Sequence, residues 1–258
     1  MKKLFLMLVI TLCGSSAFSK NVVTLANGEW PPYHSKSMKH YGLASHLIKE
    51  AFALEGIDVE YQFLPWKRGM KMAENGELNG TALWRNQAEF QDEFYYSDPV
   101  LMSETVFFHL KANPFHWHKF EDLKGINIGG TLGYSYNEDY RIAEKSKEYR
   151  IQRMAKDELN FSMLLRKRID IFPITKEVGY FLLQSKYTAE EASLITHHET
   201  SLTPENERSL HLLLSKDNKD NIELMEAFNK GLNKLKQTGR YDSYILDLKN
   251  GKYLNKHE

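Results

Sequence analysis

Trp84 and Arg85 form the adjacent pair in this sequence whose side chains best suit ligand binding. They stand at the end of an apolar run, residues 78–84, that has the composition of a buried strand. In open α/β sheets, ligands bind beyond the carboxyl ends of the strands. At that place an indole offers a stacking surface, and a guanidinium can hold an anion through two parallel hydrogen bonds. The alternative is that Arg85 pairs with Glu89 or Asp92 on a solvated turn.

Four further residues are candidate ligand contacts from the first part of the chain. Trp30 and Tyr33 lie in residues 28–33, where two prolines exclude a helix and hold the aromatic rings on an extended loop. Trp66 and Arg68 open a helix that follows the second predicted strand. The alternative for Trp30 and Tyr33 is a local lid over the core. For Trp66 the alternative is burial on the apolar face of its helix.

A second set of candidates follows two later predicted strands. Thr131, Tyr134 and Ser135 lie where a helix begins, and the free N–H groups of a helix start favour a carboxylate or another anion. A plain N-terminal cap is the alternative, and the two roles are compatible. Lys176 and Glu177 follow the next strand, either as ligand contacts or as a pair that opens a helix.

Patterns that would indicate an enzyme are incomplete. Residues 133–137 are similar to a nucleophile elbow but lack its second glycine, which leaves a hydrolase as a remote alternative. The histidines in 116–118 and 197–199 lack the i, i+4 spacing of zinc proteases, and the glycines in 128–133 do not have dinucleotide-binding spacing. We therefore predict no enzymatic activity, no catalytic residues, no metal and no cofactor.

Composition and charge narrow the class of partner. The chain has 258 residues, 42% hydrophobic and 26% charged, which is an ordinary globular balance. The 34 basic residues are matched by 34 acidic residues, and no basic block stands out. Nucleic acids and anionic membrane surfaces are therefore poor candidates as partners.

The first nineteen residues have the pattern of a secretory signal peptide. Lys2 and Lys3 precede an apolar run, and small residues at Ala17 and Ser19 fit a cleavage site near residue 19. The apolar run is far shorter than the ~20 residues that span a bilayer. We expect export to the periplasm and no membrane insertion after cleavage of residues 1–19. The single cysteine, Cys13, lies inside this leader, so the mature protein is expected to carry no thiol.

Strand and helix patterns alternate along the rest of the chain, which predicts an α/β protein with largely parallel sheets. Strands are expected at 22–27, 57–63, 78–84, 105–110, 126–130, 169–174 and 209–214. Helices are expected at 43–54, 66–75, from 137 onward, and at 157–168, 176–184, 224–235 and 241–248. Residues 196–206 are polar and show no regular pattern. Breaks at 111–114 and 203–206 are candidate linkers, and two linkers suggest a discontinuous first lobe with a second lobe inserted.

An ordered set of short motifs resembles the bacterial extracellular solute-binding proteins of family 3. The matching pieces are residues 28–33, 75–80, 96–99, 122–125 with 128–129, 168–170, and 211 onward with 229–232 and Gly239. The resemblance implies the two-lobed, type 2 periplasmic binding fold with two crossover hinge strands. Lobe 1 would comprise residues 20–110 plus 211–258, and lobe 2 residues 111–210. The ligand would lie in the cleft between the lobes, which close by a hinge motion.

The resemblance also implies a function and a partner. Such a protein captures a small polar ligand that carries a carboxylate, such as an amino acid, and works as a monomer with the permease of an ABC-type transporter. The family's carboxylate-binding Arg would fall on Phe90 here, so Arg85 is the substitute. The family's ammonium-binding Asp aligns near Thr175 and Lys176. These two departures motivate an alternative, a periplasmic sensor of the same fold that docks on a membrane receptor.

Overall fold

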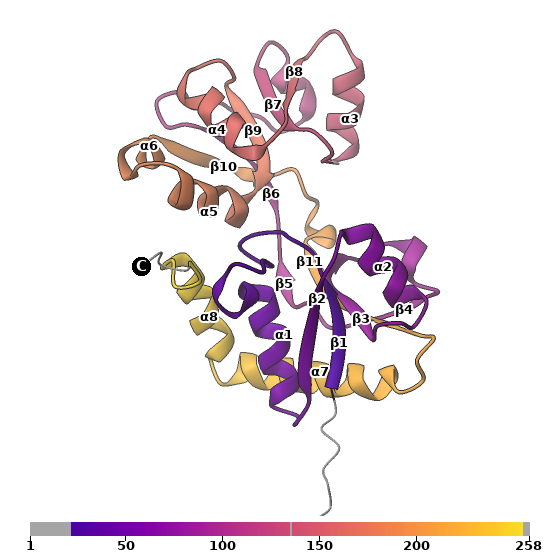
Figure 1. The fold of residues 1–258 in the computed structure, drawn as a ribbon. Helices are drawn as coiled ribbons and strands as arrows, with labels where there is room; N and C mark the ends of the chain where they lie inside the picture. The colour runs from indigo at the N-terminus through magenta and orange to yellow at the C-terminus, as the bar shows by residue number, and fades with distance from the viewer. Residues whose placement is uncertain (1–21, 135, 255–258) are drawn as a thin grey trace, which may run out of the picture.

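The structure, a computed structural model, describes residues 22–134 and 136–254. These residues form two bodies, each built on its own sheet, and Figure 1 shows one above the other. The predicted signal peptide, including Cys13, lies outside the described residues, as does Ser135. The expected α/β class with two sheets is confirmed, and each sheet combines parallel and antiparallel neighbours.

The first sheet has the strand order β2-β1-β3-β11-β4, with β5 paired to β11. Its strands are β1 (Val22–Asn27), β2 (Asp58–Phe63), β3 (Gly80–Arg85), β4 (Phe94–Tyr96), β5 (Leu101–Met102) and β11 (Ser209–Ser215). Strand β1 runs parallel to β2 and β3, whereas β11 is antiparallel to β3, β4 and β5. The strand from the C-terminal part of the chain thus completes the sheet begun by the N-terminal part.

Four helices and two short 3-10 turns accompany this sheet. They are η1 (Lys39–Tyr41), α1 (Leu43–Ala53), α2 (Trp66–Glu74), η2 (Ala88–Phe90), α7 (Asn221–Gln237) and α8 (Arg240–Lys249). Helices α1 and α7 pack closely, because Gly231 of α7 has no Cβ: one built there would lie 1.9 Å from the carbonyl oxygen of Ala51. Phe52 and Phe228 meet beside this contact with ring centroids 5.1 Å apart.

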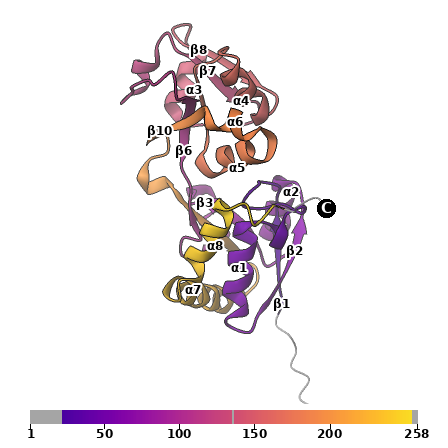
Figure 2. The same cartoon turned by 90° about the vertical axis from the view of Figure 1, so that its left-hand side faces the viewer.

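The second sheet has the strand order β10-β6-β9-β7-β8. Its strands are β6 (Thr105–Leu110), β7 (Asn127–Thr131), β8 (Arg150–Met154), β9 (Ile171–Thr175) and β10 (Ile195–Ser201). The helices of this body are η3 (Phe120–Leu123), α3 (Glu138–Lys145), α4 (Asp157–Leu165), α5 (Lys176–Lys186) and α6 (Ala189–Ser193). In both Figure 1 and Figure 2, α5 lies on the side of this body that faces the first one.

The chain crosses between the bodies twice. The first crossover is at Ser103 and Glu104, between β5 and β6, and the second spans residues 202–208, which include η4 (Glu205–Glu207). The predicted linker at 203–206 lies in the second crossover. The one predicted at 111–114 is wrong: it is a turn inside the second body, because β6 pairs with β9 and β10. Asn113 and Pro114 end a strand there without changing sheets.

Four strands escaped the sequence pattern: the short β4 and β5 of the first sheet, and β8 and β10, which lie at the edges of the second sheet. Strand β10 occupies most of the segment expected to be irregular, and it pairs only with β6. Strand β8 pairs only with β7. An edge strand with one partner tolerates polar side chains, so neither strand carries an apolar run.

Candidate functional site

Three cavities in the described part of the chain are lined by residues of both bodies, and two of them adjoin each other. The smaller, of about 410 Å³, is lined by Trp30, Arg85, Gln87, Thr105, Tyr134, Tyr136, Asn137, Ile174, Thr175, Leu202, Thr203, Pro204 and Glu207. The larger, of about 930 Å³, is lined by residues 29–31, 35, 37 and 38 of the first body, by Tyr134, Asp157 and Glu158, and by one face of α5. Trp30 from the first body and Tyr134 from the second line both cavities.

Arg85 lies at the carboxyl end of β3 and reaches the segments that join the bodies. Its Nη1 donates to the carbonyl oxygen of Ser103 at 3.5 Å and to the carbonyl oxygen of Glu207. Burial lowers the pKa of Arg85, and the charges of Glu207 and Tyr33 oppose that shift. The predicted cation therefore lines the smaller cavity while it contacts both crossovers.

Tyr33 connects the two bodies. Its ring is 1% exposed, and its hydroxyl donates to Oε2 of Glu177, the second residue of α5, at 2.9 Å. Burial raises the pKa of Tyr33, and the neighbouring carboxylate of Glu177 raises it further. Trp30 packs edge-to-face on Tyr33 with ring centroids 4.8 Å apart. The predicted residues Tyr33 and Glu177 thus form a hydrogen bond between the two bodies, and the predicted Trp30 packs against Tyr33.

The loop that carries Trp30 and Tyr33 is tied together by its own backbone. The amide of Trp30 donates to the carbonyl oxygen of His34 at 2.8 Å, and the amide of His34 donates back to that of Trp30 at 3.1 Å. His34 is buried and contacts Oγ of Ser45 through Nδ1 at 2.9 Å. Burial lowers the pKa of His34 to about 3, so this anchor of the loop is neutral.

Trp66 and Trp84 contribute packing within the first body rather than lining either cleft cavity. Trp66 lies against Gly28, where a Cβ would be 2.2 Å from the indole ring. The Trp66 and Trp84 rings meet edge-to-face with centroids 5.5 Å apart, and Nε1 of Trp84 donates to Oγ1 of Thr81 at 3.1 Å. Arg68 is exposed on α2 and lines neither cavity.

The turn after β7 differs from the predicted anion site. The amide of Thr131 donates to the hydroxyl oxygen of Tyr136 at 2.9 Å, and the amide of Tyr134 donates to the Thr131 carbonyl oxygen at 3.3 Å. Arg153 fixes the turn by donating from Nη1 to the carbonyl oxygens of Thr131 and Tyr134 at 2.6 and 2.9 Å. Both N–H groups therefore already donate hydrogen bonds within the turn. The prediction that they bind an anion is wrong.

A carboxylate, Asp157, occupies this wall of the cleft. It is the first residue of α4, and it accepts from Oγ1 of Thr131 at 2.5 Å and from the Tyr134 hydroxyl at 2.8 Å. Burial raises the pKa of Asp157, while the two hydrogen bonds oppose that rise. Sequence patterns alone do not single out Asp157, because an acidic residue in the first turn is common in ordinary helices.

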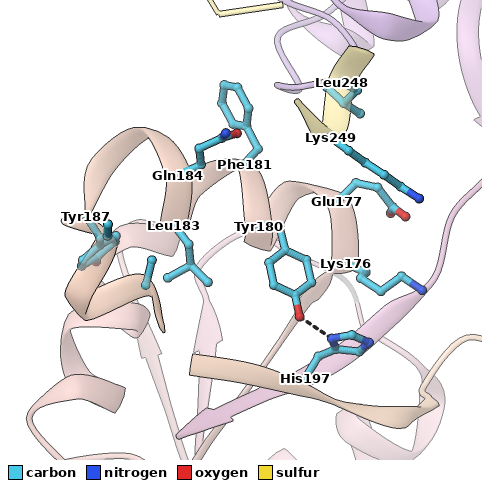
Figure 3. A pocket seen from close by; sticks show the side chains of 12 residues that line it. Lys176, Glu177, Tyr180, Phe181, Leu183, Gln184, Tyr187, His197, Leu248 and Lys249 are labelled. Carbon is cyan, nitrogen blue, oxygen red and sulfur yellow. Dashed lines mark hydrogen bonds between the residues drawn. The ribbon is translucent and has the colours of Figure 1, made fainter. Parts of the chain in front are cut away.

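Lys176 is held away from the two cleft cavities. Its Nζ forms an ion pair with Glu104 of the first crossover, and Arg208 of the second crossover lies 3.4 Å from the same carboxylate. Lys176 instead lines a groove of about 620 Å³ along α5, shown in Figure 3, where the Tyr180 hydroxyl lies 2.6 Å from Nδ1 of His197. Thr175, one of the two residues near which the resemblance places the family's Asp, lines the smaller cleft cavity.

Within residues 22–134 and 136–254, no helix is long and apolar enough to cross a membrane. No three histidine, cysteine, aspartate or glutamate residues of these segments gather where they could hold a metal ion.

Known structures share this architecture. The second substrate-binding domain of a putative amino acid ABC transporter from Streptococcus pneumoniae aligns with a TM-score of 0.67 at 21% identity, over 92% of this chain and 100% of that one. Substrate-binding domain 2 of GlnP from Lactococcus lactis, in its open conformation, gives 0.68 at 18% identity, over 93% and 98%. A histidine kinase sensor domain with similarity to periplasmic binding proteins gives 0.62 at 14% identity, over 92% and 96%.

No curated protein matches this sequence. The family of bacterial extracellular solute-binding proteins, family 3, matches residues 22–246. That match covers most of the chain, and the two-sheet fold agrees with it. The chain therefore belongs to family 3 of the bacterial extracellular solute-binding proteins.

Proposed function

We propose that this protein is a periplasmic binding protein that captures a small polar ligand bearing a carboxylate and delivers it to the permease of an ABC-type transporter. The observation that carries the proposal is the cavity between the bodies, lined by a cation from one and by Tyr134, Tyr136 and Thr175 from the other. Ligand pockets form preferentially at domain interfaces, with a few placed polar groups among apolar ones. Family membership supports solute binding as the role of that cavity.

The proposal includes the division of the chain into lobes. Residues 22–102 with 209–254 form one lobe, residues 105–201 form the other, and the two crossovers serve as the hinge. The leader, residues 1–19, is removed on export, and the mature protein acts as a monomer without enzymatic activity. Closure of the lobes on the ligand then presents one closed surface to the membrane partner.

Arg85 holds the ligand carboxylate in this proposal. A guanidinium carries five N–H donors in a planar fork. Within the described part of the chain, the hydrogen bonds of Arg85 all run from Nη1. The Nε and Nη2 groups are left to form a bidentate pair with a carboxylate in the smaller cavity.

The test is calorimetric titration of the mature protein with a panel of amino acids and other carboxylates, after a thermal-shift screen. Arg85→Gln should weaken binding of the best ligand about 10- to 150-fold, the equivalent of about 1.5–3 kcal/mol for a hydrogen bond to a charged group. Arg85→Lys should restore only part of the loss, since a lysine ammonium lacks the planar fork. Arg68→Gln, on the exposed face of α2, is the matched control and should bind normally. Wild-type affinity in Arg85→Gln would refute this assignment.

A sensor is the second candidate function. It is favoured by Thr175 in the smaller cavity, at the place where amino-acid-binding members carry an acid, and one neighbour of the same fold is a histidine kinase sensor domain. Affinity capture on detergent-solubilised membranes of the source cell distinguishes the two roles. Recovery of a permease with its ATPase supports uptake, whereas recovery of a receptor kinase supports sensing.

A further inference from the structure

Glu29, Asp157 and Glu158 line the larger cavity without an ion pair inside the described segments, and Asp157 is the one that the cavity-lining Tyr134 holds by a hydrogen bond. An ionised carboxylate has about four acceptor sites, and the bonds from Thr131 and Tyr134 occupy two of them. None of the ion pairs formed within the described segments involves Asp157. A carboxylate that is partly withdrawn from water and lacks a counter-charge is costly, so its place on a cavity wall favours a cation supplied from outside.

Aromatic rings line this cavity from both bodies. Tyr134, whose hydroxyl binds Asp157, lines the cavity from the second lobe, and Trp30 lines it from the first. Aromatic faces attract ammonium and guanidinium groups, and indole does so most strongly. Glu29 and Glu158 also line this cavity, together with one basic residue, Lys186. The wall of the cavity therefore carries a net negative charge.

We propose that Asp157, Tyr134 and Trp30 form a subsite for a cationic side-chain group of the ligand, a guanidinium or an ammonium. This inference rests on the proposed function, since it adds a second charged contact to the same ligand. Arg85 lines only the smaller cavity and Asp157 only the larger, with Trp30 and Tyr134 shared by both. The ligand is therefore dipolar: its carboxylate lies at Arg85 and its cation lies beyond the Trp30 and Tyr134 rings.

The subsite lies at a different place from the one the family's sequence pattern predicts. Strand β9 leads to the smaller cavity, and its last residue is the uncharged Thr175. Asp157 comes instead from the start of α4, directly after β8. The proposed subsite thus uses an acid on the helix that follows β8, whereas β9 ends in an uncharged residue.

The experiment compares two probes of nearly equal shape. L-arginine and L-citrulline differ in that the guanidinium of the first is a neutral urea group in the second. Both are titrated calorimetrically into the wild type, Asp157→Asn, Arg85→Gln and Asp139→Asn. The last is the matched control, since Asp139 is an exposed carboxylate in the first turn of another helix, α3, and lines neither cavity. Tyr134→Phe is a second variant that keeps the ring and removes the bond to the carboxylate.

We expect the wild type to bind L-arginine about tenfold or more tightly than L-citrulline, and Asp157→Asn to remove this preference while leaving L-citrulline affinity within about twofold. Asp139→Asn should keep the preference. Equal affinity for both probes in the wild type, binding of neither probe, or a preference that survives in Asp157→Asn overturns the subsite. If both probes bind equally and Arg85→Gln weakens both, the proposed function stands without the subsite. If no carboxylate in the panel binds, the proposed function fails as well.

Discussion

The hydrogen bond between Tyr33 and Glu177 should control how readily the lobes separate. It is a direct side-chain bond from the first lobe to the second, with an oxygen–oxygen distance of 2.9 Å. Tyr33→Phe removes only the hydroxyl, and the ring remains in the core beside Trp30. Any change in the balance between associated and separated lobes then reports the lost bond rather than lost packing.

The size of the effect follows from the surroundings of the two groups. A hydrogen bond to a charged group contributes about 1.5–3 kcal/mol. Glu177 is half-buried and can regain water when the lobes part, so the lower end of this range applies. A loss of about 1.5 kcal/mol changes the ratio of associated to separated lobes about tenfold, in favour of separation.

Single-molecule energy transfer measures this ratio directly. The only cysteine of the sequence, Cys13, lies in the predicted leader, so the mature chain accepts a pair of introduced labels. Lys49→Cys on α1 and Lys147→Cys after α3 are exposed positions, one on each lobe. Titrating ligand into the labelled wild type and the labelled Tyr33→Phe protein then gives both the resting ratio and its response.

Tyr61→Phe is the matched control. Its hydroxyl donates to the carbonyl oxygen of Ser45 at 2.6 Å, entirely within the first lobe. The control should leave the energy-transfer distribution unchanged even if it lowers the unfolding temperature. If Tyr33→Phe gives the wild-type distribution, or if both variants change it equally, the bond does not hold the lobes together.

Two further predictions concern the stability of the first lobe. Gly231→Ala should reduce the free energy of unfolding by about 1–3 kcal/mol, because the added Cβ would meet the Ala51 carbonyl oxygen at 1.9 Å. Urea unfolding measures this change, with Glu226→Ala at an exposed position of the same helix as the control. Equal unfolding midpoints for the two variants would contradict the close packing. Burial lowers the pKa of His34 from 6.5 to about 3, so below about pH 6.5 the unfolded chain gains a proton that the folded chain refuses. As the pH falls below about 6.5, this group should lower the free energy of unfolding by up to about 1.4 kcal/mol for each pH unit. His34→Asn should remove that share of the slope between pH 7 and 5, whereas an unchanged slope would show that the folded protein accepts the proton.

Apolar runs allowed the inner strands to be predicted. Strands β1, β6 and β9 are buried by neighbours on both sides, so nearly every residue in them is apolar or small. Strand β10 was missed because His197, His198 and Glu199 carry no strand pattern, and it exists through its pairing with β6. The first crossover was misplaced for a related reason: Ser103 and Glu104 lack a breaking residue, since an extended chain passes between the lobes without a turn.

The candidate site was predictable in part. Arg85 could be selected because it ends a buried strand, where ligands gather. Trp84, one residue earlier, packs instead with Phe90 and the first-lobe cluster, as expected when successive side chains of a strand point to opposite faces. Asp157 could not be selected, because its place in the site depends on hydrogen bonds from Thr131 and Tyr134. These residues lie more than twenty positions earlier in the chain and contact Asp157 only in the folded protein.

In the proposed function, Arg85 also couples the ligand to the hinge between the lobes. Its Nη1 contacts a carbonyl oxygen in each of the two segments that join the lobes. A bound anion that draws the guanidinium deeper into the cleft lengthens those contacts and frees the backbone of both segments to twist. Occupancy of the cleft and stiffness of the pivot are then linked thermodynamically through a single side chain, and no relay through either sheet is needed.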